Sequence, residues 1–240
     1  MIKKDQPIIF GSAVVAGVSS VDDGNMKLGV GDDTSVVKNR RHFLDQLGVD
    51  SRHTTRVTIT YDTDNFAKYR VVTHHDKGNG MHDDDAVDYA DALVVDRPNH
   101  ALFLPIADCV GAILYDPVKR VLMVSHLGRH SVEIDGAAKS VTYLMRQYDC
   151  NPADVLVWLS PAVGSATYPL NKFDGKSLHY VIQVQLAAMG ILADHVEVSD
   201  IDTAHDENYF SHSEFLKDAT KPSGRFAVVA MMVAQGEPAA

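Results

Sequence analysis

A carboxylate, a thiol and an imidazole stand beside long apolar stretches of this chain. Asp108 and Cys109 directly follow one stretch, and His126 ends another. The segments between them flank Asp116-Pro117, a turn signal, so two antiparallel strands there would bring Cys109 and His126 together. A thiol beside an imidazole forms either a nucleophile–base pair or two ligands of a metal site. The alternative is an ordinary core, in which Cys109 acts as a small apolar side chain.

The residues around this pair could support such chemistry. A buried carboxylate without partners is costly, so we expect Asp108 to bind a neighbour or to border a cavity, as an orienting residue or a general base. Gly128 to Ser131 precede a predicted helix, whose first amides, with Arg129 and His130, could hold a phosphate or a carboxylate. The alternative is that Ser131 only caps the helix.

The other candidates carry less chemistry. Cys150 precedes a helix-to-strand loop and has no evident partner, so we expect a structural role. Ser160 follows a strand but lacks the strand–elbow–helix pattern of a nucleophile. The spacing of His205, His212 and Glu214 fits no standard metal motif, so we expect these three in solvated loops.

The apolar pattern predicts an α/β protein whose helices cover the faces of its sheets. Strands are expected over residues 8–18, 57–61, 69–72, 92–95, 101–106, 111–115, 121–124, 155–159, 196–199 and 225–233. One helix should lie between the capping residues 31–34 and Gly48, and two more over 132–148 and 178–189. The polar segment 73–88 reads as a loop. Cys109 and His126 are thereby placed at strand ends.

Composition narrows the function further. The chain has 240 residues and 45% hydrophobic residues, and no linker or repeat divides it, so we expect one domain over residues 1–240. The formal net charge of −10 argues against binding nucleic acid or an anionic membrane. Two cysteines cannot build a disulfide framework. With neither a signal peptide nor an apolar span in sight, a cytoplasmic protein acting on a small molecule is expected.

Short motifs spread over residues 8 to 233 resemble the YfiH family, also called the laccase-domain or multicopper polyphenol oxidoreductase family. Each motif is short, but their shared order is specific. They are Gly31-Asp32-Asp33, Asn39-Arg40, residues 90–94, Ala107-Asp108-Cys109, His126-x-Gly128, residues 160–164 with Tyr168, Phe210-Ser211 and Gly224-Arg225.

The resemblance implies a four-layer α/β sandwich, in which two mixed β-sheets lie between helices. It also implies a metal site, usually zinc and sometimes copper, built from a cysteine and two histidines. Cys109 and His126 match two of these ligands. Counting back from Cys109 places the third near His75 or its neighbour His74, whereas counting on from Asn39-Arg40 places it near Asp62. We expect His75, because a Cys-His-His set suits zinc better than one containing a carboxylate.

The family's activities suggest a zinc enzyme that acts on purine nucleosides, by phosphorolysis, by deamination of adenosine, or both. Three protein ligands would leave one zinc position for water. Arg40, Arg129 and His130 would hold substrate or phosphate. Two alternatives stay open: a Cys-His amidase of peptidoglycan precursors or a copper-dependent polyphenol oxidase, and a non-catalytic member that binds a nucleoside or a partner.

The missing histidine of the family's first ligand motif, together with an altered motif at Arg129-His130, motivates that last alternative. Arg129-His130 replaces the Trp-Arg of the family motif, and Asp202-Thr203 replaces its late Cys-Thr pair. Both changes fall within motifs, so we expect them to alter the substrate pocket.

Overall fold

Two mixed β-sheets form the centre of the protein. The computed structural model describes residues 6–61, 63–83 and 89–234. One sheet has the order β1 (Val14–Val18), β10 (Phe226–Met232), β5 (Ala101–Ile106) and β2 (Thr54–Arg56). The other has the order β3 (Tyr69–Val71), β4 (Ala92–Val95), β7 (Val121–Leu127), β6 (Val110–Asp116), β8 (Leu156–Leu159) and β9 (Val196–Val198). Each combines parallel and antiparallel pairs.

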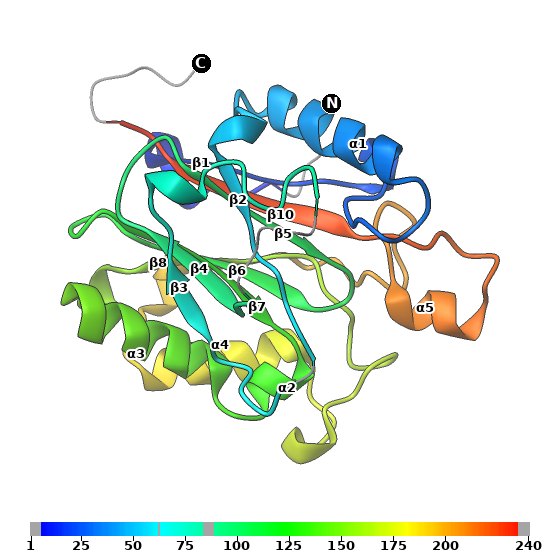
Figure 1. Ribbon diagram of the computed structural model, residues 1–240. Helices are drawn as coiled ribbons and strands as arrows, with labels where there is room; N and C mark the ends of the chain where they lie inside the picture. The colour runs from blue at the N-terminus through cyan, green and yellow to red at the C-terminus, as the bar shows by residue number, and fades with distance from the viewer. Residues whose placement is uncertain (1–5, 62, 84–88, 235–240) are drawn as a thin grey trace.

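Helices cover the outer faces of both sheets (Figure 1). Helix α1 (Asp33–Gln46) packs on the four-stranded sheet, and α3 (Gly136–Tyr148) and α4 (Leu178–Ala188) pack on the six-stranded one. The short helices α2 (Arg129–Val132) and α5 (His212–Lys217) lie near the strand ends. Single 3₁₀ turns are η1 (Gly11–Ala13), η2 (Val21–Asp23), η3 (Ser51–His53), η4 (His74–Asp76), η5 (Pro152–Asp154), η6 (Asn171–Phe173) and η7 (Ala193–His195).

Three apolar cores separate these layers, as the alternation of side chains along the strands requires. On β5, Leu102 and Leu104 face the core between the sheets, whereas Ala101 and Phe103 face the core beneath α1. A third core joins the six-stranded sheet to α3 and α4. The layers therefore run helix, sheet, sheet, helix, and the predicted α/β sandwich of two mixed sheets is confirmed.

The hairpin of β6 and β7 sets the position of the candidate site. Its turn is stabilised by Asp116, whose Oδ1 accepts hydrogen bonds from the backbone N–H groups of Val118 and Lys119, each 2.8 Å long. The turn signal at Asp116-Pro117 is thus confirmed. Gly111 pairs with His126 across the hairpin, so the residues just before β6 and at the end of β7 meet at one sheet edge.

Some predicted boundaries were wrong. Residues 57–61 are not a strand: β2 ends at Arg56, and the chain then runs along a cavity, where Val57 and Ile59 are lining residues rather than sheet residues. The N-terminal strand begins only at Val14, after η1. The predicted helix 132–148 is interrupted, because Asp135 adopts a left-handed φ of 62° between α2 and α3.

The described part of the chain contains no helix long and apolar enough for a membrane span.

Candidate functional site

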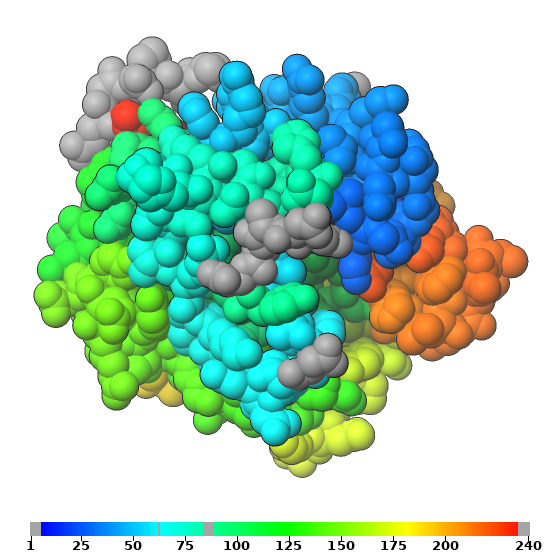
Figure 2. All heavy atoms as spheres, in the orientation of Figure 1, coloured from blue at the N-terminus to red at the C-terminus, as the bar shows by residue number. Residues whose placement is uncertain are grey.

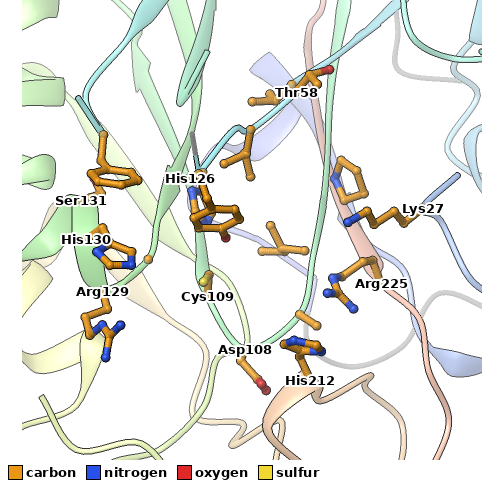
Figure 3. Close-up of a pocket in the computed structure, with 18 of the residues that line it drawn as sticks. Lys27, Thr58, Asp108, Cys109, His126, Arg129, His130, Ser131, His212 and Arg225 are labelled. Atoms are coloured by element: carbon orange, nitrogen blue, oxygen red, sulfur yellow. The ribbon is translucent and has the colours of Figure 1, made fainter. Parts of the chain in front are cut away.

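Cys109 and His126 meet over Gly128. A Cβ built on Gly128 would lie 2.9 Å from the Cys109 sulfur and 3.1 Å from Nε2 of His126. Both atoms therefore border the same small space, which exists because residue 128 has no side chain. Cys109 lies in the turn between β5 and β6, and His126 lies near the end of β7, just before α2 (Figure 3). The structure thus brings the two predicted residues together.

Burial keeps both groups in their neutral forms. It raises the pKa of the Cys109 thiol to about 12, with the Asp108 carboxylate adding to the rise. It lowers the pKa of the His126 imidazole to about 4, and the nearby His130 lowers it further. Proton transfer from this thiol to this imidazole is therefore unfavourable near neutral pH. A soft cation is what would stabilise the thiolate, and a neutral imidazole is its usual companion ligand.

Nδ1 of His126 is the second unusual feature of the pair. It is buried and has no hydrogen-bond partner among the described residues. Buried imidazole nitrogens are normally hydrogen bonded, and exceptions concentrate at functional sites. The ring is therefore held by packing, with Nε2 towards Cys109.

Asp108 fixes the turn that carries Cys109. Its Oδ1 accepts a hydrogen bond of 2.8 Å from the Thr203 hydroxyl, and its Oδ2 accepts one of 2.7 Å from the backbone N–H of Ser213. The residue has a left-handed φ of 68° and its carboxylate points away from the Cys109 sulfur (Figure 3). Asp108 is thus a positioning residue, and Thr203, the second residue of the Asp202-Thr203 pair, is one of its anchors.

The pair opens onto a cavity of about 460 Å³, within the usual size range of small-molecule sites. Aromatic rings form part of its wall: Tyr61, Phe66, Tyr89 and Tyr168. Positive side chains form much of the rest: Lys27, Arg56, Arg129 and Arg225. The cavity can therefore accept a ligand with both a flat ring and negative charge.

Arg129 and His130 lie on the same side of the cavity as His126. The imidazole of His130 stacks on Phe66, with ring centroids 4.7 Å apart, and meets Tyr61 edge-on. The guanidinium of Arg129 lies 5.8 Å from the ring centre of Tyr168. These contacts use the two positions at which this sequence departs from the family's Trp-Arg pair, so the departure reshapes the cavity wall rather than removing it.

Arg40 does not lie in the cavity, and its predicted role in holding phosphate was wrong. The side chain is buried beneath α1, where Nε donates to the carbonyl of Met26 and Nη1 to those of Gly80 and Met81. The guanidinium also lies over the ring of Phe103. Its charge therefore holds three backbone segments together and is not available to a ligand.

The predicted third ligand is not brought to Cys109 and His126. His75 and His74 stack on each other in η4, an exposed turn outside the cavity. The reason is strand direction: β3 runs parallel to β4, whose first residue Ala92 pairs with Ser125, so the chain beyond β3 moves away from the His126 end. The alternative ligand, Asp62, lies outside the described residues. Within the described ranges, no three potential ligands are grouped closely enough for a metal ion.

The lesser candidates occupy structural positions. The Ser160 hydroxyl accepts a hydrogen bond of 2.8 Å from the backbone of Gly111 and donates to the carbonyl of Pro161. Cys150 is buried in the core beneath α3 and α4. His205 bonds Asp202, with 2.8 Å between Nδ1 and Oδ2, and is exposed.

His212 and Arg225 are cavity residues that sequence reasoning missed. His212 is not in a solvated loop: it begins α5 and lines the cavity, as does Arg225 just before β10. The sequence signal for these two residues is their place beside family motifs, since His212 directly follows Phe210-Ser211 and Arg225 directly follows Gly224. Arg225 reaches the cavity because β10 pairs with β5 beside the Cys109 turn, and His212 reaches it because the N–H of Ser213 binds Asp108.

A model of a known protein family matches this chain. The model, described as multi-copper polyphenol oxidoreductase laccase, matches residues 12–176. The chain belongs to this family. The resemblance drawn from the short motifs is therefore confirmed.

Known members of the laccase-domain family share the fold. YfiH from Bacillus licheniformis is 26% identical, with a TM-score of 0.81 over 91% of this chain and 92% of that chain. YlmD from Geobacillus stearothermophilus is 22% identical, with a TM-score of 0.84 over 98% of each chain. Purine nucleoside phosphorylase YlmD from Bacillus subtilis is 28% identical over 58% of this chain, and the match spans only 49% of that relative.

Proposed function

We propose that this protein is a purine nucleoside phosphorylase, with adenosine deamination as a second activity of the same site. Phosphorolysis forms a bond between phosphate and C1′ of the sugar and breaks the bond from C1′ to the base, which leaves with a proton. The observation that carries the proposal is the neutral Cys109–His126 pair facing a cavity with aromatic and positively charged walls. The name of the Bacillus subtilis relative supports the same reaction.

We propose that zinc completes this site, with copper as the alternative metal. Cys109 and His126 fit two ligand positions, because a sulfur and a neutral imidazole nitrogen border one space. Bound zinc would supply the positive charge that a buried thiolate requires and would polarise a bound oxygen. His75 does not line the cavity, which leaves Asp62, outside the described residues, as the third ligand in this proposal.

The aromatic and positive residues have separable roles in this proposal. The stacked rings of Phe66 and His130, with Tyr61 against them, offer a face for a purine base. Arg129, held over Tyr168, offers N–H donors to sugar or phosphate oxygens. Asp108 keeps the Cys109 turn in place through Thr203 and the start of α5.

Two other functions receive less support. A Cys-His amidase needs a thiolate nucleophile, and burial raises the pKa of Cys109 to about 12 while lowering that of His126 to about 4. A multicopper oxidase needs several histidine-rich centres, and the described part of the chain holds no cluster of three potential ligands.

The test is product analysis with purified protein that carries no histidine tag. Inosine, adenosine and methylthioadenosine are each incubated with and without phosphate, and bases, sugar phosphates and ammonia are followed by chromatography. The proposal predicts base release that requires phosphate and falls at least tenfold in Cys109→Ala. Equal base release by the wild-type protein and Cys109→Ala, or no base release from any of the three nucleosides, would refute it.

A further inference from the structure

A second group of basic residues lines the same cavity as Cys109 and His126. It consists of Lys27 in the loop before α1, His212 at the start of α5, and Arg225 before β10. Figure 3 shows Lys27 and Arg225 across the cavity from Cys109 and His126, with His212 beside Asp108. Nothing in the proposed reaction uses them so far. We call these three residues the basic corner.

Backbone hydrogen bonds hold the basic corner together. Oδ1 of Asn25 accepts from the backbone N–H of Lys27, at 3.0 Å, and from that of Arg225, at 2.9 Å. One residue thus joins the loop before α1 to the start of β10. The Ser213 N–H that binds Asp108 fixes the start of α5 in the same way. Figure 2 shows the orange segment of α5 against the blue segment near α1.

These contacts leave the charged ends of the basic corner directed at the cavity. The corner's backbone is fixed by neighbours, and Nη1 of Arg225 donates to the carbonyl of Gly224 at 2.6 Å, which orients the guanidinium. Arg225 and His212 have no ion pair within the described ranges. A guanidinium held in one orientation presents its remaining donors as a planar fork, which matches the oxygens of a phosphate.

Charge in this part of the cavity is one-sided. Burial lowers the pKa of His212, and the positive charges of Arg225 and Lys27 lower it further, while Asp108 acts in the opposite sense. Asp108 is the only carboxylate among the described lining residues. Both of its oxygens already accept hydrogen bonds, from Thr203 and from Ser213. An anionic ligand beside His212 and Arg225 would therefore face more basic than acidic side chains among the described lining residues.

We infer that His212 and Arg225, with Lys27 beside them, form a binding site for a phosphate-sized dianion. Because both groups line one cavity, an anion bound there would face Cys109 and His126 across it. The inference rests on the proposed function for the claim that the anion is a reactant, but not for the claim that it binds. The anion is either inorganic phosphate or the phosphate group of a nucleotide, which share the same chemistry.

Calorimetric titration with inorganic phosphate tests the site directly. Arg225→Met should weaken phosphate binding about ten- to a hundredfold, the loss expected for charge-assisted hydrogen bonds. His212→Gln should weaken it less, and Arg225→Lys should lie between Arg225→Met and wild type. The matched control is Arg97→Met, which removes the same charge from a side chain that is 76% exposed beside Asp96, away from the cavity.

A parallel titration with inosine and inosine 5′-monophosphate separates the two sources. If a nucleotide is the ligand, the gain in affinity from the 5′-phosphate disappears in Arg225→Met. If inorganic phosphate is the ligand, its KM in phosphorolysis rises in Arg225→Met while the KM for inosine changes less than about twofold. Circular dichroism checks that each variant is folded. If Arg225→Met does not fold, His212→Gln and Arg225→Lys are used for the same comparison.

The outcomes distinguish this site from the proposed function. Phosphate binding that depends on Arg225 in a wild-type protein without phosphorolysis would refute the function and keep the site. Phosphorolysis with unchanged phosphate affinity in both Arg225→Met and His212→Gln would refute the site and keep the function. Equal weakening by Arg97→Met would show a general charge effect and would also refute the site.

Discussion

Gly128→Ala is the sharpest perturbation that this site allows. The backbone of Gly128 has φ −93° and ψ 179°, a conformation that alanine adopts without strain. The added methyl group would therefore act only through its contacts, which are the Cys109 sulfur at 2.9 Å and the His126 ring at 3.1 Å. It would occupy the very space that the two side chains border.

The size of the effect follows from these distances. Non-bonded carbon and its neighbours are most stable at about 3.5–4.0 Å, so the sulfur or the ring must move by several tenths of an ångström. Overpacking of this kind lowers the free energy of unfolding by about 1–3 kcal/mol. A displacement near 1 Å at a reacting centre reduces the rate about a hundredfold. We therefore expect kcat/KM for phosphorolysis to fall by about ten- to a hundredfold in a protein that stays folded.

The assay compares three quantities in each variant: kcat/KM, bound zinc per chain by elemental analysis, and the urea midpoint. The matched control is Gly17→Ala on β1, where a Cβ would lie 2.9 Å from Cδ2 of Leu47, away from the cavity. It should lose similar stability and keep its activity and zinc. Full activity and full zinc content in a folded Gly128→Ala protein would show that the chemistry does not occur between Cys109 and His126.

Three further outcomes are expected. Cys109→Ala should lose bound zinc and activity together and regain part of the activity in excess zinc, whereas a covalent role for the thiol allows no such recovery. Arg40→Met should lower the free energy of unfolding by about 3 kcal/mol, because three carbonyl groups lose their donor, and should leave KM unchanged, as urea titration and kinetics would show. Burial lowers the pKa of His100 to about 4 from 6.5, so below pH 6.5 the unfolded chain binds a proton that the folded protein does not. Stability is therefore lost as pH falls from 6.5 towards 4, by up to about 3 kcal/mol, and His100→Gln should flatten this dependence in urea titrations.

Local patterns were sufficient to predict most of the fold. The Asp116-Pro117 turn joined two apolar runs and thereby placed Cys109 opposite the end of β7, as the register of the hairpin requires. Helix α1 begins where its capping signal stands, since Asp32 accepts hydrogen bonds from the N–H groups of Thr34 and Ser35. Such signals act within a few residues, so they are visible in the sequence alone.

The misplaced residues depend on contacts between distant segments. Arg40 looks like a ligand for phosphate until the chain brings Met26, Gly80 and Met81 around it. His75 lies far from Cys109 because β3 runs parallel to β4. An apolar pattern predicts a strand but not the direction in which it pairs with its neighbour. Arg225 reaches the cavity through the pairing of β10 with β1 and β5, and His212 through the hydrogen bond from Ser213 to Asp108.

The net charge of the whole chain is negative, whereas the described residues that line the cavity are mainly basic. A net charge of −10 argues against a basic surface for nucleic acid, yet the described residues of the cavity wall include four arginine or lysine side chains and one carboxylate. The two facts are compatible, because at physiological ionic strength exposed charges act over only about 8 Å, whereas charges within a cavity are screened much less. A small anion that reaches the cavity therefore responds to Arg129 and Arg225 rather than to the distant acidic surface. Net charge bears on the exposed surface as a whole, but a buried site must be judged from the side chains that line it.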